Sequence, residues 1–201
     1  MMEFGKPWTL MRLGIIFVGL LFFQYLQLSE ALARESSSIT FGGAGGTRSY
    51  NLDCGSGWVM IGGGANAYAH MDQMIVFCRA MNANGTLSEE KYTKGPVGGM
   101  GGDELGGGRA DCQTGRVVTG VKVEAGRFVN NVQFLCEVWD SSRKEPIFED
   151  SPFRDRIGVS CVGCTRYRTF RCPRGKVAKA LRGKSGIYID SVRLVCDDWN
   201  K

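Results

Sequence analysis

Residues 172–196 have the sequence CPRGKVAKALRGKSGIYIDSVRLVC: a cysteine, a turn ending in glycine, an alternating run, a loop, and a second alternating run that closes on cysteine. Residues 54–78 (CGSGWVMIGGGANAYAHMDQMIVFC) and 112–136 (CQTGRVVTGVKVEAGRFVNNVQFLC) follow the same plan without a gap. The two cysteines lie 24 positions apart in each segment, and the segments begin 58 and 60 residues apart. A fixed period of this length is typical of repeat architectures. The chain therefore contains three copies of one unit, spanning about residues 39–81, 96–139 and 157–199.

Each unit contains short runs that are rich in β-branched residues and bounded by glycine, as is typical of strands. The second run of each unit alternates, which predicts one buried face; its inward-facing residues are Met74, Val76, Val132, Phe134, Val192 and Leu194. No window has a helical period, and we expect the polar connectors, residues 82–95 and 140–156, to hold the turns. Three small sheet-forming units must share one core. We therefore predict an all-β, three-repeat β-prism: three antiparallel sheets with pseudo-threefold symmetry.

Residues 1–33 have the features of a secretory signal peptide. Lys6 and Arg12 precede the apolar run LGIIFVGLLFFQYLQL, and Ala31-Leu32-Ala33 supplies a small-x-small cleavage site. The alternative is a membrane anchor, but the run falls short of the ~20 residues that span a bilayer. We expect cleavage after Ala33, a polar leader over residues 34–38 and a single domain over residues 39–201. The mature protein would be secreted, or periplasmic in a bacterium.

All eight cysteines follow residue 33, and an even number in an exported chain indicates disulfides. If each unit is a hairpin folded about its loop, antiparallel pairing sets its first cysteine opposite its second. The predicted disulfides are Cys54–Cys78, Cys112–Cys136, Cys172–Cys196 and, by elimination, Cys161–Cys164. A zinc site at CVGC would need a second ligand pair, and the only histidine is His70. We expect no metal and no cofactor.

A glycine-rich segment precedes the first cysteine of units one and two: FGGAGG (residues 41–46) and PVGGMGGDELGGG (residues 96–108). The third unit has GVSCVGC (residues 158–164) instead. Counting back from the unit cysteine sets Cys161 and Cys164 at the positions of Gly43 and Gly46. We therefore expect a disulfide clip to replace the glycine loop in the third unit.

The repeated order of glycine-rich loop, strand, turn, strand, loop with a terminal Asp, and strand resembles the jacalin-related lectins. With its paired cysteines it also resembles the vitelline membrane outer layer proteins, over about residues 39–199. The resemblance implies a sugar site made of a Gly-x-x-x-Asp loop and a glycine loop from the start of the chain. GIYID (residues 186–190) matches completely, whereas GRFVN (126–130) lacks the carboxylate and YAHMD (68–72) lacks the glycine. The sugar-binding candidates are Gly186, Ile187, Tyr188, Asp190, Gly42, Gly43, Gly45 and Gly46, with Asp72, His70 and Asn130 as weaker candidates.

The candidate residues suit sugar chemistry. A carboxylate accepts strong hydrogen bonds from hydroxyl groups, and Tyr188 could offer an aromatic face to a sugar ring. The same motif also suits a tight hairpin turn, in which glycine supplies a positive φ and aspartate caps backbone amides. Two hypotheses follow: a secreted carbohydrate-binding protein, or a structural coat or matrix protein without a sugar site. The lone histidine, and the location of Asp72 and Asp190 in different units, speak against an enzyme.

The net charge is +5, and it is unevenly spread. Residues 154–184 hold ten basic side chains against one acidic one, Asp155. Such a field attracts polyanions, so an acidic extracellular polysaccharide is a candidate partner beside other glycans; the alternative is a solvated basic face with no partner. The export signal speaks against nucleic acid. Asn84 begins an N-glycosylation sequon that is used only if the host modifies exported proteins.

Overall fold

The three hairpins of the repeat form the centres of three antiparallel sheets. A computed structural model describes residues 36–149, 153–161 and 167–200. The chain divides into Met1–Arg34 and Glu35–Lys201, and all described residues belong to the second unit. Its elements are β1 (Ser36–Ser37), β2 (Phe41–Gly42), β3 (Arg48–Asp53), β4 (Trp58–Ala67), β5 (Met71–Met81), β6 (Leu87–Gly98), α2 (Glu104–Gly107), β7 (Arg109–Asp111), β8 (Arg116–Ala125), β9 (Val129–Asp140), β10 (Glu145–Ile147), β11 (Phe153–Gly158), β12 (Tyr167–Arg171), β13 (Val177–Ser185) and β14 (Ile189–Asp197).

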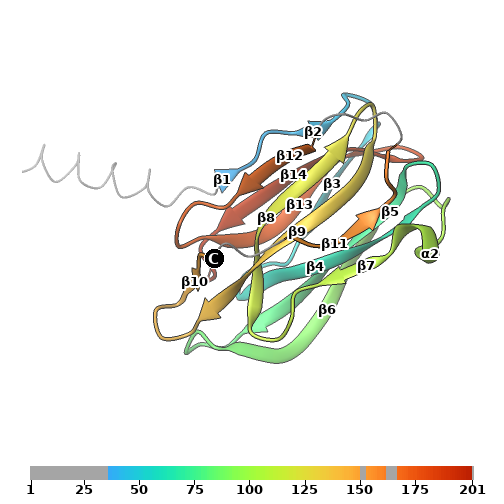
Figure 1. Ribbon diagram of the computed structural model, residues 1–201. Helices are drawn as coiled ribbons and strands as arrows, with labels where there is room; N and C mark the ends of the chain where they lie inside the picture. Colours follow the sequence, from blue (N-terminus) through green and yellow to red (C-terminus); the bar gives the residue numbers. More distant parts are fainter. Residues whose placement is uncertain (1–35, 150–152, 162–166, 201) are drawn as a thin grey trace, which may run out of the picture. The chain divides into compact units, whose positions relative to one another are not determined.

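The sheets are linked by a cyclic exchange of strands. Each contains one hairpin, β4–β5, β8–β9 or β13–β14. The first hairpin strand also pairs with the strand that leads into another unit: β7 on β4, β12 on β8 and β3 on β13. Figure 1 shows the N-terminal strands (blue) along the C-terminal hairpin (red). The exchange therefore joins the first unit to the third, and the predicted all-β architecture of three antiparallel sheets is confirmed.

The inward faces of the three hairpins form one core. The six side chains predicted to face inward on the second hairpin strands are all buried, which confirms the alternation. Phe134 on β9 is completely buried, and it reaches the facing sheet at Gly63 on β4. A Cβ atom at Gly63 would lie only 3.1 Å from the Cζ of Phe134. The glycine run of β4 thus makes room for the largest side chain at the centre.

The turn at the start of each hairpin explains the glycine three residues after each first cysteine. Gly57, Gly115 and Gly175 have φ values of 75°, 77° and 77°. A Cβ atom at any of the three would meet nothing within 4 Å. Backbone conformation, rather than crowding, therefore requires glycine at this position.

The structure confirms three of the predicted disulfides: Cys54–Cys78, Cys112–Cys136 and Cys172–Cys196, with Cα–Cα distances of 5.6, 5.6 and 5.7 Å. Cys161 is also disulfide-bonded. Its predicted partner, Cys164, lies outside the described residues, as do the predicted signal peptide and its cleavage site. Each confirmed disulfide joins the two strands of one hairpin.

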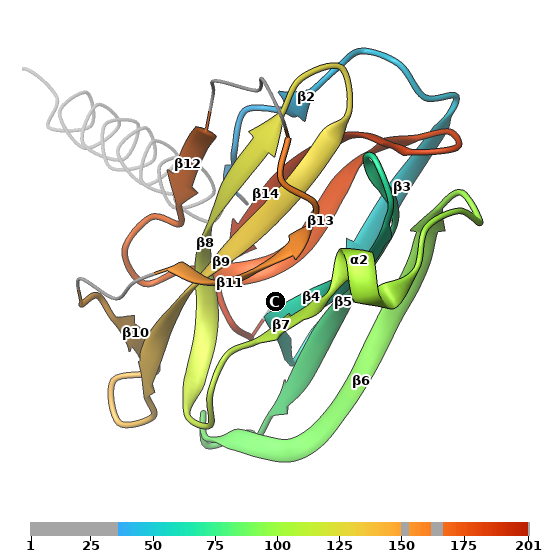
Figure 2. The same ribbon diagram turned by 45° about the vertical axis from the view of Figure 1, so that its right-hand side comes forward.

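Several segments predicted as connectors or leader form strands instead. Most of the connector 82–95 belongs to β6, which pairs with β5, and β10 and β11 in the connector 140–156 pair with β9. Figure 2 shows β6 along the outer edge of its sheet. Edge strands tolerate charged side chains because only one neighbour bonds to them and one face meets water. Polar composition therefore hid these strands. Ser36 and Ser37, within the predicted leader, form β1 against β14.

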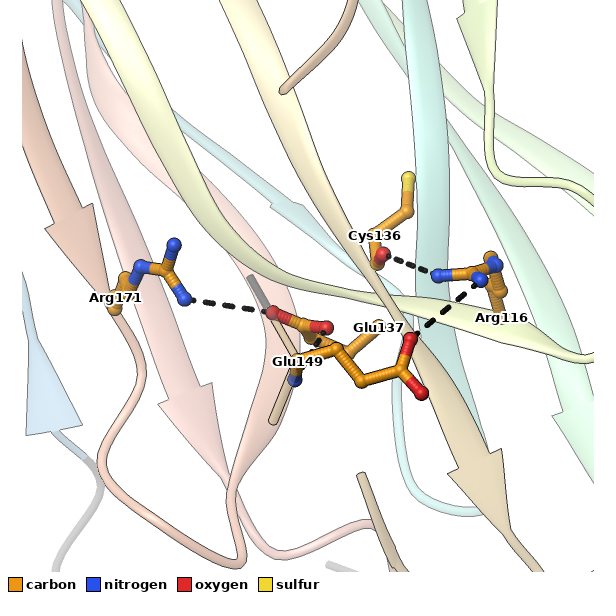
Figure 3. A network of polar contacts seen from close by, with 5 residues as sticks. All are labelled: Arg116, Cys136, Glu137, Glu149 and Arg171. Atoms are coloured by element: carbon orange, nitrogen blue, oxygen red, sulfur yellow. Dashed lines mark hydrogen bonds and ion pairs between the residues drawn. The ribbon is translucent and has the colours of Figure 1, made fainter. Parts of the chain in front are cut away.

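A buried carboxylate on β9 links an irregular connector and the edge strand β12 of the second sheet (Figure 3). The Glu137 side chain is 0% exposed; Arg171 Nη1 lies 3.4 Å from its Oε1, and the Glu149 N–H donates to its Oε2 at 3.1 Å. Arg116 Nη1 donates to the Cys136 carbonyl at 3.2 Å, and its Nη2 lies 3.8 Å from Glu149 Oε2. A buried charge needs compensation of this kind. At least one arginine of the basic run, Arg171, is therefore used inside the fold.

Candidate functional site

The strand exchange brings the two predicted halves of a sugar site together. The loop of residues 186–188 connects β13 to β14, which begins with Ile189 and Asp190, and the glycine loop of residues 42–46 follows the start of β2. The Gly43 N–H donates to the Asp190 carbonyl at 2.9 Å. A Cβ atom on Gly45 would lie 2.3 Å from Asp190 Oδ1, and one on Gly46 would lie 2.7 Å from Oδ2. The Asp190 carboxylate thus rests directly against glycine backbone.

The Asp190 carboxylate has unused hydrogen-bonding capacity. The residue is only 4% exposed, yet among the described residues no hydrogen bond is made to its side chain. In the described part of the chain, the side-chain polar atoms that are both fully enclosed and unpaired belong to Arg79, Thr119 and Asn131. The Asp190 oxygens are not among them, so they are not sealed from solvent. A carboxylate that is neither sealed nor paired can accept hydrogen bonds from outside. Asp190 therefore does not cap its own hairpin.

Asp72 occupies the equivalent position in the first unit. The Gly99 N–H donates to its carbonyl at 2.9 Å. Cβ atoms on Gly101 and Gly102 would lie 2.5 Å and 2.7 Å from its Oδ1 and Oδ2. Its side chain differs from that of Asp190 in one respect: Oδ2 accepts a hydrogen bond from the Tyr68 N–H at 3.1 Å. Asp72 is thus partly committed to its own hairpin, as the turn interpretation of the motif requires.

The sequence analysis did not identify residues 99–102 as the glycine loop that contacts Asp72. The signal was present, because each glycine segment leads into a strand that pairs with the hairpin of another unit. Once the loop of residues 42–46 is assigned to Asp190, the repeat predicts that the loop of the second unit contacts Asp72. The exchange, applied to all three units, pairs this loop with Asp72.

The protonation of Asp72 gives a test of this geometry. Burial raises the pKa of Asp72 above its ordinary value, and the Tyr68 N–H and the charge of His70 oppose this only in part. A carboxyl whose pKa is higher in the folded state binds more protons when folded, so its contribution to stability falls as the pH rises above about 4. The Asn side chain in Asp72→Asn does not titrate, so this loss of stability with rising pH disappears. Its amide oxygen can still accept a hydrogen bond from the Tyr68 N–H. We expect the variant to gain stability relative to wild type between about pH 4 and about pH 7.

Denaturant unfolding of both proteins across this pH range measures the difference. A difference that does not change with pH, or that shifts in favour of wild type as the pH rises, would contradict the assignment. Asn130 stands naturally at the equivalent position of the second unit, so an amide is compatible with this site in the fold.

The third glycine segment shows that the predicted alignment was wrong. The Val159 N–H donates to the Asn130 carbonyl at 2.9 Å, as Gly43 does to Asp190. Gly158 (φ 90°) therefore occupies the position of Gly42 (φ 102°). It follows that Cys161 stands at the position of Gly45, not of Gly43. The connection from this glycine to the unit cysteine is two residues longer than in the first unit, which misdirects a count taken from the cysteine.

The third residues of the three hairpin loops meet one another. Ring centroids lie 4.9 Å apart for His70 and Phe128, 5.2 Å for His70 and Tyr188, and 4.8 Å for Phe128 and Tyr188. The Asn130 amide nitrogen lies 3.1 Å from His70 Nδ1. The sequence predicts Tyr188 as a stacking face for a sugar; in the structure its ring contacts the rings of the other two loops. Its half-buried ring packs against the other two loops and fixes the loop that carries Asp190.

Backbone contacts also interlock the loops. A Cβ atom on Gly43 would lie 2.3 Å from the Arg127 carbonyl oxygen, and one on Gly99 would lie 2.3 Å from that of Ile187. Gly43 is therefore held between the second and third hairpin loops. The exposed tip residue Ile187 faces the glycine loop of the second unit with its backbone. This backbone packing adds to the ring contacts that hold the candidate site in place.

The described residues contain no cluster of metal ligands and no membrane-spanning helix. No three histidine, cysteine, aspartate or glutamate residues in this part of the chain are grouped to hold a metal ion. Nor does this part contain a helix that is long and apolar enough to cross a membrane.

The fold is shared with solved lectin structures. The sequence itself matches no protein-family model and no curated protein. The structure resembles Malaysian banana lectin (TM-score 0.53, 12% identity, covering 82% of this chain and 99% of the lectin) and artocarpin, a lectin with mannose specificity (0.54, 11%, 82% and 98%). It also resembles a mannose-binding jacalin-related lectin from Ananas comosus (0.51, 15%, 82% and 98%). The chain therefore has the β-prism fold of the jacalin-related lectins.

Proposed function

We propose that this protein is a secreted carbohydrate-binding protein that holds a sugar at Asp190 and binds it without catalysis. The observation that carries the proposal is the unpaired Asp190 carboxylate, which lies against the backbone of Gly45 and Gly46. Two adjacent sugar hydroxyls could donate to its two oxygens, and hydrogen bonds to a charged acceptor are about twice as strong as neutral ones.

Backbone donors complete the chemistry. The N–H groups of Gly45 and Gly46 make no hydrogen bond to another described residue. A hydroxyl oxygen bound beside the carboxylate can therefore accept from this loop while its proton is donated to Asp190. Each sugar hydroxyl can both donate and accept a hydrogen bond. A rigid pair of loops that offers backbone donors beside a carboxylate acceptor therefore suits it. Secretion is proposed from the signal-like residues 1–33 and agrees with the disulfides, which form in oxidising compartments.

The glycine contacts supply the test. In Gly45→Ala the new methyl group would overlap Asp190 Oδ1, whereas in Gly101→Ala it would overlap Asp72 Oδ1 at the equivalent position. We expect a glycan array to show binding by wild type, loss of that binding in Gly45→Ala, and retention in Gly101→Ala. Mannose oligosaccharides should be included because artocarpin has mannose specificity and the Ananas comosus lectin binds mannose.

The array also decides between the two hypotheses. If wild type binds no glycan, the proposal fails and the structural coat or matrix protein is favoured. If Gly101→Ala loses binding and Gly45→Ala does not, the sugar site belongs to Asp72.

A further inference from the structure

A positively charged pocket adjoins the candidate sugar site. It has a volume of about 350 Å³, in the size range of small-molecule sites. Gly43 and Ala44 of the glycine loop form one wall, and Arg182, Lys184 and Arg193 of β13 and β14 form another. The basic side chains lie on the solvent face of their sheet, because the residues that alternate with them point into the core.

Two of these three cations are unpaired within the described structure. Arg182 is engaged: its Nη2 lies 3.6 Å from Asp53 Oδ2, and its Nε donates to Asn51 Oδ1 at 3.0 Å. The side chains of Lys184 and Arg193 make no ion pair or hydrogen bond with any described residue. Positive charge on this wall therefore exceeds the nearby negative charge.

Two other basic residues of the third unit are neutralised by neighbours. Arg171 pairs with Glu137 (Figure 3), and Lys176 Nζ lies 3.6 Å from Asp197 Oδ1. The basic run of the sequence is thus not a uniform charged face. Within the run, Lys184 stays unpaired among the described residues and lines the pocket beside the glycine loop, together with Arg193 of β14.

Strand register sets the distance between the pocket and Asp190. Lys184 lies directly opposite Ser191, the residue that follows Asp190. Arg193 is three positions beyond Asp190 on β14, about 10 Å along the strand. The pocket shares Gly43 and Ala44 with the glycine loop, so two or three linked sugars bound at Asp190 are long enough to reach both cations.

We propose that the ligand is an acidic oligosaccharide, carrying sulfate or carboxylate groups, with one sugar at Asp190 and its acidic groups in the pocket at Lys184 and Arg193. The inference rests on the proposed function and specifies its substrate class. Arginine binds planar or tetrahedral oxyanions through two parallel hydrogen bonds, and lysine adds a compact point charge. A neutral glycan would leave both cations unused.

Calorimetric titration with a heparin-derived tetrasaccharide and its chemically desulfated counterpart tests the inference. At low salt, wild type should bind the sulfated form at least about tenfold more tightly, and the difference should shrink as salt screens the charges. Lys184→Gln/Arg193→Gln should lose this preference and bind the desulfated form as wild type does. Lys94→Gln/Arg174→Gln changes charge equally, away from the pocket, and should keep the preference.

Failure of the inference is distinguishable from failure of the proposed function. Equal affinity of wild type for the two tetrasaccharides, or a preference kept in Lys184→Gln/Arg193→Gln, overturns the acidic-ligand inference while a site at Asp190 still stands. Binding of the sulfated form that is unaffected by Asp190→Ala overturns the shared site. Wild-type binding to phosphatidylserine vesicles that depends on Lys184 and Arg193, with no binding to either tetrasaccharide, would assign the pocket to a lipid surface and overturn the inference.

Discussion

Substituting Asp190→Ala should weaken glycan binding at least about 100-fold, measured by calorimetry with a glycan that wild type binds. Hydrogen bonds to a charged group contribute about 1.5–3 kcal/mol each. Loss of two of them exceeds the ~2.7 kcal/mol that corresponds to a factor of 100. No described residue donates to this carboxylate, so its removal breaks no hydrogen bond within the described part of the chain. Folding stability should therefore change little, which separates a lost site from a lost fold.

Asp72→Ala is the matched control for this prediction. Asp72 has the same backbone contact to a glycine loop and nearly the same burial, 6% against 4% exposed. It differs because its carboxylate already accepts from the Tyr68 N–H. We expect Asp72→Ala to retain glycan affinity within about twofold and to lose about 1 kcal/mol of stability with that hydrogen bond. Equal loss of affinity in both variants would mean that the two positions share the function.

Replacing Cys112 and Cys136 together by alanine should lower the free energy of unfolding by about 3.5 kcal/mol. A disulfide stabilises the fold by restricting the unfolded chain, and its effect grows with the length of the loop that it closes. The value of about 3.5 kcal/mol is for a loop of about 25 residues. The measurement is guanidinium unfolding of the variant and of oxidised wild type. Replacing both cysteines leaves no free thiol that could form mixed disulfides.

The repeat provides an internal comparison for this prediction. Cys54–Cys78 and Cys172–Cys196 close loops of the same length, with a sequence separation of 24. The three double variants should therefore lose similar stability, apart from local packing. A loss below about 1 kcal/mol in all three would contradict the chain-entropy explanation.

The covalent and hydrophobic features of the fold could be predicted because they repeat within single units. The cysteine spacing paired residues across each hairpin, and alternation in the second strands identified side chains such as Val132 and Phe134 as buried. Both signals depend only on positions within about 25 residues. Three copies of each signal made the pattern clear without any knowledge of how the units meet.

Contacts between units could not be predicted from the same local signals. A leading strand such as β3 or β7 has the same alternation whether it pairs with its own hairpin or with another, so its partner β13 or β4 was not determined by pattern. The match of Asp190 with the first glycine loop came from the family resemblance. The position of Tyr188 depends on rings from two other units, which no spacing within its own loop could indicate.

A sugar site at Asp190 can be located from the amide chemical shifts of the isotope-labelled protein during titration with a glycan that it binds. We expect the amides of Gly45, Gly46 and the loop of residues 186–190 to shift as the glycan is added, while those of Gly101 and Gly102 stay in place. Shifts confined to the Asp72 loops, or no shifts in either set despite measured binding, would contradict a sugar site at Asp190.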